Sequence, residues 1–242
     1  MTLYAPPLAS KSAGRYDRYF YTGAALIAAL TVFAGFAPTY FLRARFDSTP
    51  LPLYLHVHGF LFTSWIALLV AQAGLVAVRR VDLHRKLGWA TAGLAVAMVC
   101  AGATAGILSM RGEVAAGYED EARTFLTTPL LSMVVFAALV AAAASYRRHP
   151  QTHKRLMLLA TISLLDAPIA RLPFAIVSAT TWGHYVFTDL FIVAAIGYDL
   201  LTRRRVDRAY LWGGLLIVIG QVLRTPIGET TAWHSAARLL IG

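Results

Sequence analysis

Residues 51–78 read LPLYLHVHGFLFTSWIALLVAQAGLVAV, an apolar run that contains no Asp, Glu, Lys or Arg. A helix of about 20 apolar residues crosses the roughly 30 Å hydrocarbon core of a bilayer, so this run is long enough to span a membrane. Six more apolar runs occupy most of the remaining chain, at residues 19–42, 87–110, 124–146, 156–175, 184–202 and 209–222. The sequence therefore predicts an all-α fold, with one integral membrane domain over residues 1–242 that forms a bundle of seven transmembrane helices.

The basic residues predict how this bundle is oriented. Fifteen of the 22 Lys and Arg residues precede the first run or lie between runs two and three, four and five, and six and seven, all on one side of a seven-span bundle. Glu113, Glu119, Asp120 and Glu121 gather on the other side. The positive-inside rule then places the N-terminus in the cytoplasm and the C-terminus outside. Topology accounts for the net charge of +10, so no nucleic-acid partner is expected.

The C-terminal segment, residues 229–242, has the pattern of a short amphipathic helix. Trp233 and Arg238 are typical of a helix that lies in the membrane interface. We expect this helix on the outer interface, where it either caps a cavity or anchors the end of the chain.

Two histidines are predicted to lie at one level of the bundle. The segment from Arg79 to Gly88 resembles the segment from Arg147 to Met157, because in each an Arg-Arg pair ends one apolar run and a histidine with two basic residues opens the next. These histidines, His84 and His153, are either interfacial or face each other as ligands of a haem or metal ion. Cys100 is the only cysteine, so any metal would need histidine, carboxylate or methionine ligands.

Several polar side chains lie inside the predicted spans, where a charge costs about 2.5–3.5 kcal/mol or more unless it is paired. His58 shares a helical stripe with Gln72 in the second run, and Gly59 beside it leaves room for a close neighbour or a flat ligand. Pro168 is expected to bend the fifth helix between its two charged residues. The candidate site residues in the last three runs, or just beyond the last of them, are Asp166, Arg171, His184, Asp189, Gln221 and Arg224.

This set has two interpretations. The first is a structural ion-pair clamp between the last three helices. The second is an outward-facing polar cavity, which Tyr118, His184 and His234 would also line. The uncharged polar residues His58 and Gln72 favour the cavity, because a clamp does not need them.

Several motifs resemble a group of uncharacterised bacterial multi-pass membrane proteins: Gly35 to Tyr40, His56-Val-His58-Gly59, His84 to Gly88 and His149 to Met157. The second run with Gln72 and the following His84-Arg is also similar to domains of unknown function, one of which is associated with cytochrome oxidase assembly. The resemblance implies a multi-pass protein of the bacterial cytoplasmic (inner) membrane. A weaker similarity to cytochromes of the b561 type implies an inner haem on His84 and His153 and an outer one on His58 and His184.

Three functions follow as hypotheses. The leading one is a haem- or metal-binding protein of redox or respiratory-assembly type, with a haem b or a metal ion on the four histidines His58, His84, His153 and His184. Arg171 and Arg224 would then pair the haem propionates, with Gln72, Asp166, Asp189 and Gln221 as the surrounding polar network. The alternative is a non-catalytic accessory or transport protein that binds a lipid, quinone or small solute. A zinc-dependent membrane hydrolase, with His58, Asp166 and His184 as the zinc ligands, is the third. Besides the lipid bilayer, the expected partners are a respiratory complex or further copies of the chain.

Overall fold

The computed structural model describes residues 11–47, 49–178, 180 and 182–242, and the secondary structure in these residues is entirely helical. The long helices are α1 (Lys11–Phe36), α2 (Leu53–Ala77), α3 (Val81–Ala115), α5 (Thr127–Ser145), α9 (Gly183–Arg203) and α10 (Arg208–Gly228). The shorter elements are η1 (Ala37–Phe41), η2 (Arg43–Arg45), α4 (Glu119–Phe125), α6 (Pro150–Ile162), α7 (Asp166–Ile169), α8 (Ala175–Ser178) and α11 (Thr231–Ile241).

Six helical segments in the described residues are long and apolar enough to cross a membrane. They cover Tyr16–Phe41, Leu53–Ala77, Val81–Ala115, Glu119–Ser145, Gly183–Arg203 and Arg208–Gly228, and each overlaps a predicted span. Many large apolar side chains on these helices are exposed, as expected for surfaces that face lipid. The chain is thus built as a multi-pass membrane protein.

The predicted fifth span, residues 156–175, is wrong as a continuous helix. The chain there forms three short helices, α6, α7 and α8. The helix is interrupted between Asp166 and Arg171, as the sequence predicts, because α7 ends at Ile169; an additional break comes earlier, at Ser163–Leu165. Pro168 explains this position: without an N–H it cannot bond to the carbonyl of Leu164, and it lies within the first turn of α7, where no such bond is needed.

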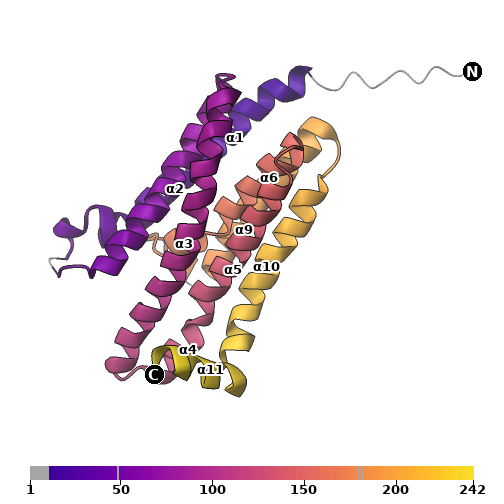
Figure 1. Cartoon of the computed structure of the whole chain (residues 1–242). Coiled ribbons are helices and arrows are strands. Elements are labelled where there is room, and N and C mark those ends of the chain that lie inside the picture. The colour runs from indigo at the N-terminus through magenta and orange to yellow at the C-terminus, as the bar shows by residue number, and fades with distance from the viewer. Residues whose placement is uncertain (1–10, 48, 179, 181) are drawn as a thin grey trace, which may run out of the picture.

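The broken segment lies in the middle of the bundle. The helix α6 contacts α1, α5, α9 and α10, and most of its apolar side chains are buried. In Figure 1, α1 begins at the same end of the bundle as the turns between α2 and α3, α5 and α6, and α9 and α10, and α11 lies at the opposite end. We call these the basic end and the α11 end.

A close backbone approach fixes the position of α7. A Cβ atom added to Gly35 of α1 would lie 2.1 Å from the carbonyl oxygen of Pro168. Only glycine leaves room for this contact, so α1 holds α7, and with it Asp166, in place. The close neighbour expected beside Gly59 is also present: an added Cβ would lie 2.5 Å from the ring of Tyr40.

The helix α10 continues past the apolar run of residues 209–222. It ends at Gly228 and includes Pro226 in its last turns. The longer helix carries Arg224 on its buried face together with Gln221, one turn earlier.

Candidate functional site

A buried polar cluster joins three helices toward the α11 end. Asp166 of α7 forms an ion pair with Arg224 of α10, with 2.9 Å between Oδ2 and Nη2. Gln221 Nε2 donates to Asp166 Oδ1 at 3.2 Å, and Arg224 Nη2 donates to Ser132 of α5 at 3.0 Å. Asp166 is 7% exposed and Arg224 is 4% exposed. Both interpretations of the sequence require these residues to lie together, and the structure brings them together.

The Arg224 guanidinium is only partly paired. Its Nε and Nη1 atoms are shielded from solvent and have no hydrogen-bond partner among the described residues. Its charged carbon lies 5.0 Å from the centre of the Tyr185 ring, so one face of the cation rests on an aromatic side chain. A buried N–H without an acceptor costs about 1–3 kcal/mol, and such groups in native proteins call for a water molecule or a ligand.

Two further predicted residues border this cluster from α9. Asp189 interacts with Gln221, while its Oδ1 atom is buried without a partner in the described part of the chain. His184 lies near both Asp166 and Arg224, and its ring packs on Tyr185 with 3.9 Å between ring centres. Gln221 therefore lies next to two carboxyl groups, of which only Asp166 is paired with a cation in the described residues.

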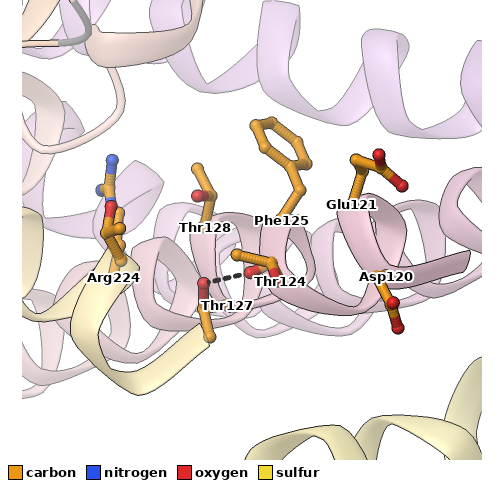
Figure 2. A pocket seen from close by; sticks show the side chains of 8 residues that line it. Asp120, Glu121, Thr124, Phe125, Thr127, Thr128 and Arg224 are labelled. Atoms are coloured by element: carbon orange, nitrogen blue, oxygen red, sulfur yellow. Dashed lines mark hydrogen bonds between the residues drawn. The ribbon is translucent and has the colours of Figure 1, made fainter. Parts of the chain in front are cut away.

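A pocket leads to Arg224 from the α11 end. Its volume is about 470 Å³, and its walls come from α4, α5 and α10: Asp120, Glu121, Thr124, Phe125, Thr127, Thr128, Thr225 and Arg224. Figure 2 shows Arg224 beyond Thr128 at one end of this row, with Glu121 toward the other end. The pocket therefore has acidic residues at its outer part, hydroxyl groups along its walls and a guanidinium at its inner end.

The predicted cavity wall differs from the observed one. Tyr118, His184 and His234 were expected to line it, and none of the three is among the residues around this pocket. His234 contacts the rim instead, since its Nε2 lies 3.2 Å from Thr124 Oγ1 and its Nδ1 lies 3.7 Å from Asp120. The helix α11 thus packs beside the pocket, and its Trp233 donates to the carbonyl of Arg123 at 2.7 Å.

Arg171 and His58 lie apart from this cluster. Arg171 is exposed, donates to the carbonyl of Ala167 at 2.7 Å and places its cation 4.9 Å from the Phe36 ring centre. His58 packs on Phe62, and its buried Nδ1 has no hydrogen-bond partner among the described residues. No ring contact joins His58 to His184 in the part of the chain that the structure describes, so the geometry gives no support to an outer haem between them.

His84 and His153 are neighbours at the basic end, as the sequence predicts. Their ring centres are 6.4 Å apart and their planes meet at 80°. His153 Nδ1 lies 2.8 Å from the carbonyl oxygen of Ala143, which as an acceptor fixes the proton on Nδ1 and leaves Nε2 free. When the Gln72 amide is oriented to satisfy its other neighbours, its nitrogen donates to His84 Nδ1 at 2.7 Å. In the opposite orientation, the amide oxygen would accept from Nδ1 instead.

A second ion network, at the basic end, was not predicted. Arg155 of α6 donates to both carboxylate oxygens of Asp199 of α9, at 2.9 and 2.6 Å, and neither side chain is more than 1% exposed. Asp17 of α1 accepts from Arg203 at 2.6 and 2.7 Å and from Tyr198 at 2.7 Å. Lys154 pairs with the same carboxylate. The sequence feature that could have predicted this network is Asp199, an acidic residue that lies inside an apolar run and four residues before Arg203.

No group of three or more His, Cys, Asp or Glu side chains is placed to hold a metal ion among the described residues. The zinc site expected from His58, Asp166 and His184 therefore has no geometric support. Comparisons with known proteins found no matching family model, no matching curated protein and no matching solved structure.

Proposed function

We propose that this protein is a non-catalytic membrane protein that binds a small polar or acidic molecule at Arg224, in a pocket open to the outer side of a bacterial cytoplasmic membrane. The observation that carries the proposal is the buried Arg224 guanidinium, whose Nε and Nη1 have no hydrogen-bond partner among the described residues, at the inner end of a pocket of about 470 Å³. Transport of the bound molecule, or its presentation to a partner protein, are both consistent with this site.

The chemistry of the site favours a ligand with an oxygen acceptor. A carboxylate, a phosphate or a quinone carbonyl would accept from the Arg224 guanidinium, and hydrogen bonds from an ionised donor are about twice as strong as neutral ones. The hydroxyl groups of Thr128 and Thr225 line the same pocket, and Phe125 offers an apolar surface. Such a mixture of apolar wall and few polar groups is typical of small-molecule sites.

The proposed orientation extends the arrangement of the helices. The segment α6–α8 would be the seventh crossing, since α6 begins at the basic end and α9 returns to it. The turns at the basic end contain Arg79 and Arg80, Arg147 and Arg148, and Arg204 and Arg205. The positive-inside rule places this end in the cytoplasm, so the pocket faces outside.

The test is to identify what co-purifies with the protein. The wild-type protein is extracted from its own membrane in mild detergent, and bound small molecules are analysed by native mass spectrometry. We expect one bound species in the wild type and its loss in Arg224→Gln. Arg238→Gln, which removes an exposed guanidinium on α11, is the matched control and should retain the species.

Arg224→Gln also leaves Asp166 buried without a cation, so its failure to bind could come from misfolding. The variant Asp166→Asn/Arg224→Gln removes both charges together and should fold while losing the ligand. An unchanged bound species in this folded double variant would refute the assignment of Arg224.

A second candidate function is electron transfer through a haem between His84 and His153. Two imidazoles that bind one metal from opposite sides at about 2.0 Å place their ring centres about 6 Å apart, close to the observed 6.4 Å. Axial histidines donate from Nδ1: His153 does so to the Ala143 carbonyl, and His84 would do so to Gln72 once the Gln72 amide is turned. The ring spacing supports a two-histidine haem, which would supply one-electron redox chemistry.

Absorption spectra of oxidised and dithionite-reduced protein test this candidate. A Soret band that shifts on reduction and disappears in His84→Ala and His153→Ala would support it. His149→Ala changes an exposed histidine in the same turn region and should retain the band. A featureless spectrum from cells supplied with haem would remove the candidate and leave the outer site unaffected.

A further inference from the structure

The polar cluster around Gln221 contains more acidic than basic side chains. Asp166 and Asp189 are its two carboxyl groups, and Arg224 is the one cation paired with them in the described residues. Gln221 donates to Asp166 Oδ1 and also interacts with Asp189, but an amide brings no charge. With both acids ionised and His184 neutral, the cluster would carry one uncompensated negative charge.

An uncompensated negative charge is energetically costly at the position of Asp189. Asp189 lies in a helix of membrane-spanning length, six residues after the first residue of α9, or about 9 Å along the helix axis. Its Oδ1 atom is shielded from solvent and has no hydrogen-bond donor in the described part of the chain. An ionised carboxylate has two oxygens that each need donors, whereas a protonated carboxyl carries its own donor and no charge.

The charged groups around the cluster do not supply the missing positive charge. Arg224 is already paired with Asp166, and Arg171, though it follows α7, lies over Phe36. No ionisable acid or base occurs in α5 or α8, nor in the Ala24–Phe36 part of α1. The basic residues Lys154, Arg155 and Arg203 belong to the ion network at the basic end.

We propose that Asp189 holds a proton, so that the Asp166–Gln221–Asp189 group is a proton-binding site beside the ligand pocket. The proton is assigned to Asp189 because Asp166 faces the Arg224 guanidinium, whereas Asp189 faces an amide. The proton would sit on one carboxyl oxygen of Asp189, the other oxygen accepting from Gln221. His184, which lies near Asp166, is the one other described group beside the cluster that can take up a proton.

This site gives the protein a way to couple ligand and proton. An acidic molecule that binds Arg224 would compete with Asp166, and a released Asp166 carboxylate would in turn need a proton. The outer part of the pocket is acidic, with Asp120 and Glu121, and disfavours the entry of anions. A ligand entering as the neutral acid would bring the proton that the cluster requires. This coupling rests on the proposed function, whereas the proton on Asp189 does not.

Infrared difference spectroscopy of the purified, ligand-free protein tests the proposal. The carbonyl stretch of a protonated carboxyl is separate from the bands of carboxylates and amides, and it shifts in D₂O. We expect this band in the wild type at neutral pH and its loss in Asp189→Asn, which changes no charge-paired residue. His184→Gln should retain it. Asp166→Asn/Arg224→Gln should also retain it, because Asp189 remains.

Two results would overturn the proposal. One is the absence of a protonated-carboxyl band in the wild type at neutral pH, which would mean that both acids are ionised and that His184 or a bound cation balances them. The other is an unchanged band in Asp189→Asn. Because no ligand is present, neither result depends on whether Arg224 binds a small molecule.

Discussion

The ion pair between Arg155 and Asp199 is expected to be one of the most sensitive points of the fold. The substitution Asp199→Asn keeps the shape of the side chain but removes the charge that faces a guanidinium only 1% exposed. Arg155 would keep its bond to the carbonyl of Gln151 at 2.6 Å and a distant contact with Asp207 at 3.8 Å. Removing one partner of a buried pair typically costs about 3–5 kcal/mol, because the remaining charge stays buried.

The same substitution removes a second contact, since Arg203 Nη1 lies 3.1 Å from Asp199 Oδ1. We therefore expect the free energy of unfolding to fall by about 3–5 kcal/mol. The measurement is unfolding by SDS in mixed micelles, followed by circular dichroism. Asp82→Asn is the control: it breaks the exposed Arg80–Asp82 contact of 3.4 Å and should leave the midpoint unchanged.

A double variant separates loss of charge balance from loss of packing. Arg155→Met/Asp199→Leu removes both charges and should recover at least half of the lost stability, since apolar residues often replace a buried pair at little cost. Recovery is incomplete because the backbone N–H of Asp207 donates to Asp199 Oδ2 at 3.2 Å and loses this acceptor. The reasoning is refuted if Asp199→Asn unfolds like the wild type, or if the double variant is no more stable than the single one.

Three further predictions concern the helix contacts and the orientation. Gly35→Ala should destabilise the protein by about 1–3 kcal/mol, because the added methyl group would push α1 away from the Pro168 carbonyl. Gly23→Ala is the control and should leave the stability unchanged, because its methyl group would meet no atom within 4 Å. Equal unfolding midpoints for the two variants would contradict this prediction. Trp233→Phe removes the bond to the Arg123 carbonyl and should cost about 1 kcal/mol, measured as faster amide exchange in α11. In a Cys100→Ala background, an impermeant maleimide added to intact cells should label Glu113→Cys but not Arg148→Cys; the reverse pattern would invert the proposed orientation.

The sequence predicted six of the helical segments because bilayer length and apolar character are properties of the chain itself. The prediction of a continuous fifth span was wrong for a local reason. Pro168 is evident in the sequence, but the position of the break depends on the carbonyl that loses its N–H donor, and that carbonyl belongs to Leu164. Arg171, which was expected beside the other charges of the last three helices, lies in the turn that follows α7. The direction of its side chain therefore depends on how the chain leaves α7.

Part of the candidate site could be predicted from the sequence, because a buried charge is costly unless an opposite charge pairs with it. That reasoning placed Asp166 and Arg224 in one polar network, and the structure brings them to 2.9 Å. The network at the basic end was missed because Lys154, Arg155 and Arg203 lie next to turns, where basic residues also occur for reasons of topology. Helical spacing alone does not tell which of these side chains turns inward to meet Asp199.

The pairing of Asp166 with Arg224 also has a consequence for how the chain is made. Asp166 is synthesised 58 residues before Arg224, so α7 leaves the ribosome before α10, which carries Arg224. Until then the broken segment holds a carboxyl group and free backbone groups that lipid cannot satisfy. Its final placement in the centre of the bundle must therefore await the arrival of α10, so the assembly of the middle of the bundle is completed by a helix that is made after it.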